Sequence, residues 1–266
     1  MREFTLYVGH GSRDSDGNEE FFAFIERIRR QAPESPCELA FLELATPTIE
    51  DGVDRCVERG AERIVVVPVI LLAASHVKIE IPEYLDLSRA KHPGVEIVYG
   101  RNVGLHAQML DMLTERFVET MDAWAPADPS STAIVVMGRG SSDADANGDV
   151  YKIGRQLWER TGVLTVEVCF SGITFPRLQD GVRRAAALGA ARIMVIPYFL
   201  FTGVLIKRMR GVVEALRDEY PGVPLVMADY LGMHERLVDV VLDRQREAAQ
   251  GLAGMNCDMC KYRLLA

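Results

Sequence analysis

The sequence predicts two similar α/β domains, each built on a parallel sheet with helices on both faces. The first observation is an internal repeat, because the letters GHGS at 9–12 recur as GRGS at 138–141, 129 positions later. The second is that Asp-Gly-Val at 51–53 recurs at 180–182 with the same offset. The third is that short β-branched runs alternate with longer helical patterns, which indicates right-handed β-α-β crossovers. A chain of 266 residues is long enough for two such domains, each with its own core.

The first half is expected to alternate four strands with four helices. Residues 5–8 and 64–67 are apolar without alternation, as in strands that are buried on both faces. Weaker strand patterns lie at 37–42 and 95–99. The helical patterns cover 19–30, 48–59, 79–91 and 105–121, and the last has an apolar stripe at helical spacing that indicates core packing.

The second half repeats this order, with strands expected at 134–137, 164–169, 193–196 and 224–227. The first copy is one residue longer, since Pro93 has its counterpart at Pro221, an offset of 128. The stretch between the copies contains two prolines and few apolar residues. We therefore predict a first domain at 1–122, a linker at 123–131, a second domain at 132–250 and a tail at 251–266.

Composition and charge argue against several functional classes. The net charge of −8 argues against a general nucleic-acid surface, which needs a basic face. No apolar run approaches the roughly 20 residues that cross a bilayer, and the first residues lack the pattern of an export signal. The five cysteines include one CxxC pair but no disulfide framework, which suits a reducing cytoplasm. We expect a cytoplasmic protein with neither a membrane nor a nucleic acid as partner.

Three polar residues of the first copy are missing from the second. They are His10, Glu43 and His76, and their counterparts are Arg139, Gly172 and Leu205. Residues shared by both copies are explained by the shared fold, whereas polar residues in one copy are better candidates for chemistry. Each of the three follows a predicted strand, and ligands of open parallel sheets bind beyond the carboxyl ends of the strands. We therefore expect these side chains on one rim of the first sheet.

Two imidazoles and one carboxylate form an N,N,O ligand set that suits a first-row divalent metal ion. The alternative for each is a structural role, since a histidine after a strand is often only a hydrogen-bonding group. The glycines of GHGS recur in both copies and predict a tight turn, because glycine permits positive φ. The GxGS pattern lacks the spacing and the lysine of a phosphate loop. His106 and His234 match each other across the copies, which favours a structural role.

Two groups of residues near these candidates suit an organic ligand. The loop Leu71-Leu72-Ala73-Ala74-Ser75 is apolar and small-sided, and it predicts either a flat wall for a planar ligand or an ordinary packed loop. The cations that are candidates for ligand carboxylates are Arg13, Arg139, Lys207, Arg208 and Arg210. A basic run such as 207–210 is also typical of a solvated helix face.

These residues resemble the CbiX/SirB-type sirohydrochlorin chelatases of the class II chelatase group. The resemblance rests on the GHGS start, the letters FLELATP at 41–47 and the pair Ser75-His76, and it includes the duplicated layout. It implies a chelatase-like fold and ATP-independent insertion of a metal into a polycarboxylate tetrapyrrole, in a cleft between the domains. By resemblance, His10, Glu43 and His76 are the metal-binding and catalytic residues. Substrate contacts fall on Ala45 and on the loop 71–75.

The tail contains the letters MNCDMC at 255–260. This MxCxxC pattern resembles the end of some long cobalt-type members, where it is associated with an iron–sulfur cluster. Cys257 and Cys260 supply only half of a four-ligand site. A cluster therefore needs non-cysteine ligands or a second chain, which predicts a homodimer through the tail. The alternative is a tail with two reactive thiols.

The resemblance and the tail together predict a sirohydrochlorin cobaltochelatase that supplies corrinoid (cobalamin) synthesis, with Co²⁺ as substrate metal. Insertion of Fe²⁺ for siroheme is the alternative with the same chemistry, since both ions accept this ligand set. A non-catalytic metal or tetrapyrrole carrier is the alternative from another class. We expect His10 to accept protons as well as bind metal, because imidazole exchanges protons near neutral pH.

Overall fold

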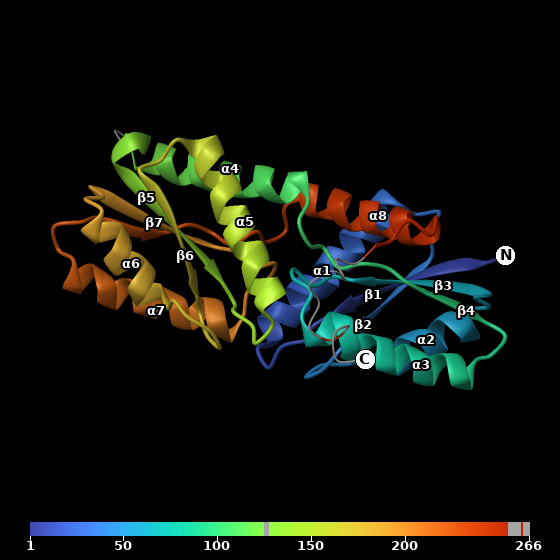
Figure 1. The fold of residues 1–266 in the computed structure, drawn as a ribbon. Helices are drawn as coiled ribbons and strands as arrows, with labels where there is room; N and C mark the ends of the chain where they lie inside the picture. The colour runs from blue at the N-terminus through green and yellow to red at the C-terminus, as the bar shows by residue number, and fades with distance from the viewer. Residues whose placement is uncertain (125–127, 255–261, 263–266) are drawn as a thin grey trace. The chain divides into compact units, whose positions relative to one another are not determined.

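The computed structural model describes residues 1–124, 128–254 and 262, and it contains two four-stranded parallel sheets (Figure 1). The elements of the first copy are β1 (Glu3–Gly9), α1 (Ser15–Gln31), β2 (Cys37–Phe41), α2 (Ile49–Glu58), β3 (Arg63–Pro68), the π-helical segment η1 (His76–Glu80), α3 (Ile81–Lys91), β4 (Glu96–Tyr99) and α4 (Ala107–Ala123). Those of the second copy are η2 (Pro129–Ser131), β5 (Thr132–Gly138), α5 (Ala144–Thr161), β6 (Thr165–Phe170), α6 (Leu178–Ala187), β7 (Arg192–Pro197), α7 (Val204–Glu219), β8 (Leu225–Met227) and α8 (Glu235–Ala249).

The two sheets have the same topology. Their strand orders are β2-β1-β3-β4 and β6-β5-β7-β8, and every pairing is parallel. The first strand of each copy is therefore central, and its carboxyl end lies beside the ends of its two neighbours. The predicted fold class is confirmed, and each predicted strand overlaps an observed one. In the described part of the chain, no helix has the length and apolar character needed to span a membrane.

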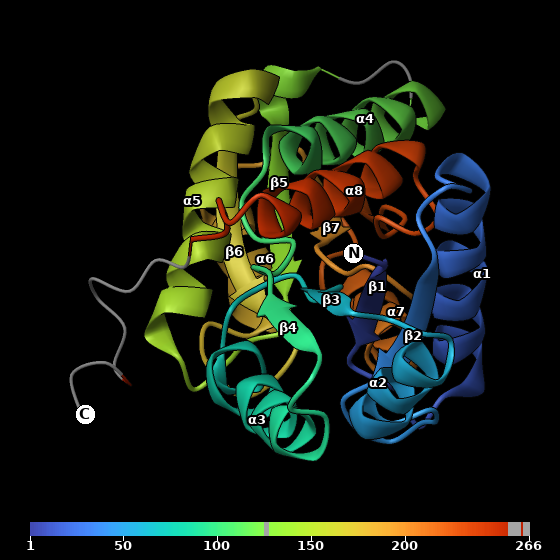
Figure 2. The same ribbon diagram turned by 90° about the vertical axis from the view of Figure 1, so that its right-hand side faces the viewer.

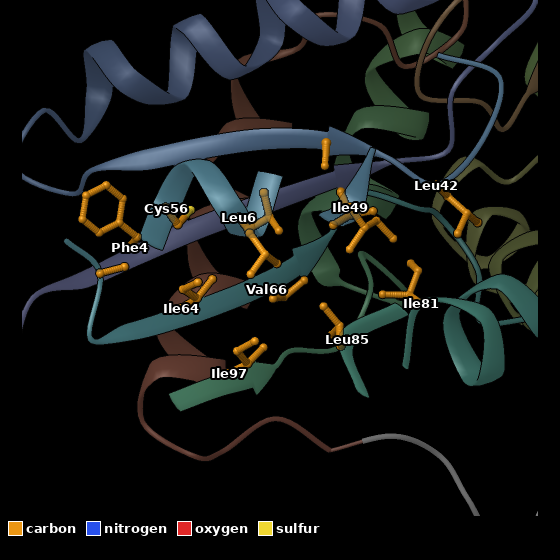
Figure 3. Close-up of a cluster of buried hydrophobic side chains, with 14 residues drawn as sticks. Phe4, Leu6, Leu42, Ile49, Cys56, Ile64, Val66, Ile81, Leu85 and Ile97 are labelled. Atoms are coloured by element: carbon orange, nitrogen blue, oxygen red, sulfur yellow. The ribbon is translucent and has the colours of Figure 1, made fainter. Parts of the chain in front are cut away.

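Side chains of the first sheet point alternately to two layers of helices. Phe4 and Leu6 of β1 point into one cluster with Ile64 and Val66 of β3 (Figure 3). Helices α2 and α3 cover this face with Ile49, Val53, Cys56, Ile81 and Leu85. Tyr7 points to the opposite face, where its hydroxyl donates to Gln245 of α8 at 2.6 Å. Figure 2 shows α2 and α3 on one side of this sheet and α8 on the other. Each buried large aliphatic side chain stabilises such a layer by about 1.5–3 kcal/mol.

Each compact unit contains a helix from the other copy of the repeat. Helix α8 lies in the unit of the first sheet, and α4 lies in the unit of the second sheet. One unit contains residues 1–104 together with the segment from Glu235, and the other runs from Leu105 to His234. Helix α8 of the second copy thus packs on the first sheet, where buried Arg244 donates to the carbonyl oxygen of Val103 at 2.8 and 3.0 Å. In the other unit, Arg116 of α4 donates to the carbonyl oxygens of Tyr230 and Leu231.

The compact units therefore differ from the predicted ranges 1–122 and 132–250. Apolar periodicity identifies α4 and α8 as helices with a buried face, but it carries no information about which sheet that face contacts. The predicted linker 123–131 lies between α4 and β5, with 125–127 outside the described residues. The predicted cysteine pair of the tail, Cys257 and Cys260, also lies outside them.

Candidate metal centre

His10 and Glu43 are placed by backbone pairing that continues past the ends of β1 and β2. The amide of Leu42 donates to the Gly9 carbonyl at 2.9 Å, and the amide of Glu43 donates to the His10 carbonyl at 3.1 Å. Gly11 turns the chain away with φ of +88°, and a Cβ there would lie 1.7 Å from the carbonyl oxygen of Glu43. The GHGS turn therefore requires glycine at position 11, since any side chain would separate the two segments.

His76 is placed by a π-helical turn of the first unit. The amide of Ile81 donates to the carbonyl of His76, five residues earlier, in place of the usual four. Such a turn holds one more residue than an α-helical turn. The copies differ by one residue in this region, since His92 follows Pro68 by 24 positions and Tyr220 follows Pro197 by 23. The matching segment in the second unit is regular α7. The extra residue of the first copy therefore corresponds to the π-helical turn that carries His76.

A carbonyl in the π-helical turn accepts a hydrogen bond from a side chain outside the turn. Pro82 has no N–H, so it cannot donate to the carbonyl of Val77. The hydroxyl of Tyr99 donates to that oxygen instead, at 2.7 Å. Burial raises the pKa of the Tyr99 hydroxyl, so the group keeps the proton that it donates. This contact satisfies a buried carbonyl that a proline would otherwise leave unpaired.

The side chains of His10, Glu43 and His76 form one cluster. One potential ligand atom from each lies within 4.8 Å of the others. His10 Nε2 is 3.6 Å from Glu43 Oε1, and the imidazole rings of His10 and His76 meet edge to face with centroids 4.8 Å apart. The side chains are 28%, 46% and 23% exposed respectively. An N,N,O set this open suits an ion that enters and leaves, whereas structural zinc sites are closed tetrahedra.

Hydrogen bonds fix which ring nitrogens can bind an ion. His10 Nδ1 lies 3.0 Å from the Gly11 carbonyl oxygen, and His76 Nδ1 lies 2.9 Å from Glu80 Oε2. Both neighbours are acceptors, so each Nδ1 carries the hydrogen and each Nε2 keeps a lone pair. Sequence reasoning missed Glu80. The signal was available, because Glu80 lies one helical turn after His76 and is an acid in the first copy only.

The second unit has the same backbone pairing at the strand ends, but Arg139, Gly172 and Leu205 stand where the first unit has His10, Glu43 and His76. The amides of Ser171 and Gly172 donate to the carbonyls of Gly138 and Arg139, as Leu42 and Glu43 do in the first unit. A Cβ at Gly140 would lie 2.2 Å from the Gly172 carbonyl oxygen. The glycines of the repeat therefore have the structural role that the sequence predicted.

The other sequence candidates are spread over both units. Ala45 and residues 71–75 are half-buried beside the cluster's strands, and Arg13 is exposed after the GHGS turn. Arg139 is exposed on the rim of the second unit. The loop 71–75 is anchored at its start, where the Leu71 carbonyl accepts from the Asn102 side chain and the Gly104 amide at 2.8 Å each. No described contact assigns these residues to a ligand, so their substrate-binding role stays a prediction.

The remaining histidines have structural partners, as expected for His106 and His234. His106 Nδ1 accepts from the Gln108 amide at 3.2 Å and caps α4, and His234 Nε2 lies 2.7 Å from Glu115 Oε2. The cysteines of the sheets and of α2 are buried, and burial raises the pKa of the Cys56 thiol to about 12. A thiol with so high a pKa binds metals poorly, since the thiolate is the ligand.

The fold and the site define a duplicated α/β chain with an open His/Glu/His ligand set at the strand ends of one copy. The CbiX family profile matches residues 5–120 and 133–248, once per copy. The chain therefore belongs to the CbiX family, which confirms the resemblance stated above.

Relatives of known name cover the chain almost completely. A sirohydrochlorin cobaltochelatase of Priestia megaterium is 43% identical over 98% of this chain and 84% of its own length. A sirohydrochlorin ferrochelatase of the same organism is 35% identical over 97% of this chain and 94% of its own. Among solved structures, SirB from Bacillus subtilis with Fe³⁺ has a TM-score of 0.82 at 34% identity, covering 94% of this chain and 97% of that one. SirB of B. subtilis subspecies spizizenii in complex with cobalt has a TM-score of 0.80 at 33% identity, with the same coverage of both chains.

Proposed function

We propose that this protein is a sirohydrochlorin chelatase that inserts Co²⁺ into sirohydrochlorin without ATP. The observation that carries the proposal is the cluster of His10, Glu43 and His76, whose ligand atoms lie within 4.8 Å of one another at the strand ends of a CbiX-family chain. The cobaltochelatase relative at 43% identity supports cobalt as the metal and sirohydrochlorin as its acceptor. Both are substrates of the reaction rather than resident cofactors.

The geometry supports a different role for each of the three residues. The Nε2 atoms of His10 and His76 bind the incoming ion, and the carboxylate of Glu43 offsets part of its charge. Insertion exchanges two pyrrole N–H protons for one divalent cation, so two protons must leave the macrocycle. Glu43 accepts one proton. His10 Nε2, which lies 3.6 Å from Glu43 Oε1, accepts the other once the ion has left it for the macrocycle and its lone pair is free. Because the site is open, the ion is released to the macrocycle rather than retained.

The substrate-binding residues complete the proposal. The apolar loop Leu71–Ser75 would lie against the face of the macrocycle, with Ala45 beside it. The guanidinium groups of Arg13 and Arg139 would bind its carboxylates, because guanidinium pairs with carboxylate in a bidentate geometry. These contacts stay predictions until a complex or a substrate titration tests them.

A direct assay distinguishes a preference for cobalt from a preference for iron. We expect the purified protein to convert sirohydrochlorin to its cobalt complex faster than to its iron complex under anaerobic conditions. The visible spectrum of the macrocycle reports each insertion, with a protein-free reaction as control. Faster iron insertion would favour the ferrochelatase alternative, which the relatives at 35% and 34% identity support.

The same assay tests the carrier alternative. A chelatase converts many equivalents of sirohydrochlorin per protein, whereas a carrier stops at one bound equivalent. A progress curve with a tenfold or greater excess of both substrates therefore distinguishes the two functions.

Three further expectations stay predictions. They are an iron–sulfur cluster at Cys257 and Cys260, a homodimer through the tail, and a cytoplasmic location. The first two concern residues outside the described part of the chain. The third rests on cysteine usage.

A further inference from the structure

We propose that Glu80 is a positioning residue for His76: it holds the imidazole ring in one orientation and one tautomer, so that Nε2 faces the metal. The proposal rests on the function proposed above, since it concerns the same metal site. It goes beyond that function because it assigns a role to a residue outside the His10, Glu43 and His76 cluster.

The hydrogen bond itself is the first argument. Glu80 Oε2 lies 2.9 Å from Nδ1 of His76, a normal length for an imidazole N–H donating to a carboxylate. His76 is 23% exposed and Glu80 is 41% exposed, so the pair is partly shielded from water. The carboxylate approaches the Nδ1 side of the ring, and Nε2 remains as the ligand atom.

The local fold is the second argument. The π-helical turn His76–Glu80 begins at the histidine and ends at the glutamate. The first copy has one residue more than the second here, so Glu80 aligns with either Arg208 or Met209, and neither is acidic. Glu80 therefore follows the pattern of His10, Glu43 and His76, which are also absent from the second copy. A glutamate that served only the shared fold would be expected in both units.

The chemistry of metal-bound imidazole explains the arrangement. A ligating histidine usually donates its other N–H to a carboxylate or a carbonyl, which fixes the tautomer and makes the ligating nitrogen more basic. His10 has a carbonyl partner in Gly11, and His76 has a carboxylate partner in Glu80. Without Glu80, the His76 ring could rotate and exchange tautomers, and fewer molecules would present Nε2 correctly.

The test compares substitutions at Glu80 by direct binding of Co²⁺ alone. We expect Glu80→Ala and Glu80→Met to lower the Co²⁺ affinity about 10- to 100-fold, because both remove the acceptor. Glu80→Gln keeps an acceptor oxygen, and we expect a loss of only about threefold from the weaker neutral hydrogen bond. The matched control is Glu83→Ala, which removes an exposed negative charge one turn further along α3 and should change nothing.

Spectroscopy separates positioning from other roles. The visible absorption of bound Co²⁺ reports its ligand geometry, so Glu80→Gln should keep the wild-type bands and Glu80→Ala should change them. In the insertion assay, the loss should fall on the KM for the metal rather than on kcat. Thermal unfolding checks that each variant is folded, and Glu80→Met retains a helix-forming side chain if the alanine variant is unstable.

Two outcomes would overturn the proposal. Wild-type Co²⁺ affinity and bands in both Glu80→Ala and Glu80→Met would mean that the hydrogen bond has no effect on the site. Equal damage in Glu80→Gln and Glu80→Ala would mean that the charge itself acts, as in direct ligation. If the wild-type protein binds no Co²⁺, the proposed function fails instead, so the two failures are distinguishable.

A different observation concerns the second unit, where Arg139 follows β5, Arg177 precedes α6 and the guanidinium of Arg208 reaches the residue that follows β6. Arg208 donates to the Ser171 carbonyl at 3.0 Å, and the Ser171 hydroxyl donates to the Arg139 carbonyl at 3.2 Å. A Cβ at Gly172 would lie 3.8 Å from a guanidinium nitrogen of Arg177. We infer that Arg139, Arg177 and Arg208 form an anion site that binds carboxylate groups of the substrate; this inference also rests on the proposed function.

Each of these arginines is specific to the second copy. The counterparts of Arg139 and Arg177 are His10 and Thr48, and that of Arg208 is Ile79 or Glu80, depending on where the extra residue is placed. Within residues 1–124 and 128–254, none of the three arginines has an ion-pair partner, whereas Arg183 and Arg210 of the same unit pair with Asp180 and Asp229. Arg177 lies over the ring of Phe175 and Arg208 donates to a carbonyl, so neither charge is offset by a carboxylate of the described residues. Guanidinium groups in this state favour a carboxylate ligand.

Arg177 also occupies the N-cap position of α6, where arginine is not a favoured residue. Thr48 caps α2, where its hydroxyl accepts from the amide of Asp51. Threonine is a favoured N-cap, and a cation at this end of a helix meets the positive end of the helix dipole. Arg177 at the start of α6 therefore lowers the stability of that helix, and a bound anion would offset the loss.

Metal-free sirohydrochlorin is the probe for this site. We expect Arg139→Gln, Arg177→Thr and Arg208→Gln each to weaken its binding about three- to fivefold, as for exposed ion pairs, with a smaller difference at high salt. Arg177→Thr should at the same time raise the Tm, because it restores the cap of the first copy. Arg183→Gln and Arg155→Gln, which remove paired arginines of the same unit, are the controls.

The Co²⁺ affinity should be unchanged in all five variants, because the metal ligands belong to the other unit. Wild-type sirohydrochlorin binding in the three rim variants would overturn the inference, and so would equal weakening in the two controls. No binding to the wild-type protein would instead contradict the proposed function.

Discussion

A His10→Ala variant should fold as the wild type does and lose metal insertion by at least about a hundredfold. In the proposed mechanism the loss combines two effects. His10 supplies one of the two imidazole ligands, and it accepts protons together with Glu43, which lies 3.6 Å away. The initial rate of cobalt insertion, followed by the visible spectrum of sirohydrochlorin, measures the loss. The fold should survive, since the side chain is 28% exposed and the turn depends on the backbone of Gly9 and Gly11.

His92→Ala is the control for this experiment. His92 lies at the end of α3, where its Nε2 is 2.7 Å from Asp54 Oδ1, and it has no place in the metal cluster. We expect insertion within about twofold of wild type. The free energy of unfolding should fall by about 1 kcal/mol, because the contact with Asp54 is partly buried, with the two side chains 18% and 31% exposed. Turnover near wild type in His10→Ala would rule out His10 as ligand and proton acceptor. The chelatase mechanism above would then need another group.

The sequence predicted the rim and three of its residues because strand order constrains where strand ends lie. His10, Glu43 and His76 follow three consecutive strands of a parallel sheet, and such ends share an edge. Comparison of the two copies then separated these residues from the glycines that both units need. The inference required no side-chain detail, and the structure brings the three side chains within 4.8 Å.

Glu80 was missed because its position depends on an irregular turn. A regular α-helix was expected over 79–91, whereas the structure begins with a π-helical segment at His76 and continues as α3. The one-residue difference between the copies was visible in the sequence, but its location within the helix was not. In the structure the turn lies where Pro82 lacks an N–H and the Tyr99 hydroxyl donates to the carbonyl of Val77, and Tyr99 lies on β4, 17 positions beyond Pro82. Such a contact cannot be inferred from local periodicity.

The second prediction concerns stability. Helices α4 and α8 each belong to the compact unit that contains the sheet of the other copy. Arg244→Ala should destabilise the unit that contains β1–β4, although Arg244 belongs to the second copy. The side chain is 1% exposed and donates twice to the Val103 carbonyl. Its removal leaves a buried carbonyl unsatisfied, and we expect the free energy of unfolding to fall by about 2–3 kcal/mol.

Arg116→Ala should have the reciprocal effect on the unit that contains β5–β8, because Arg116 donates to Tyr230 and Leu231. Hydrogen exchange measured by mass spectrometry locates each effect, since exchange in the affected sheet should accelerate while the other sheet stays protected. Arg246→Ala is the control on α8, where the side chain is 66% exposed and pairs with Asp243 and a carbonyl of its own helix. Its effect should stay within about 0.5 kcal/mol.

The pattern of exchange decides between two assignments of the helices. If each copy formed its own domain, as the ranges 1–122 and 132–250 imply, Arg244→Ala would loosen β5–β8 and Arg116→Ala would loosen β1–β4. The observed contacts require the opposite pattern, because the carbonyl that each arginine binds follows the last strand of the other copy. If His10, Glu43 and His76 bind Co²⁺ as proposed, loosening of their unit by Arg244→Ala would also lower the Co²⁺ affinity near the melting temperature. Helix α8 of the second copy therefore supports the unit that carries the candidate metal site of the first copy.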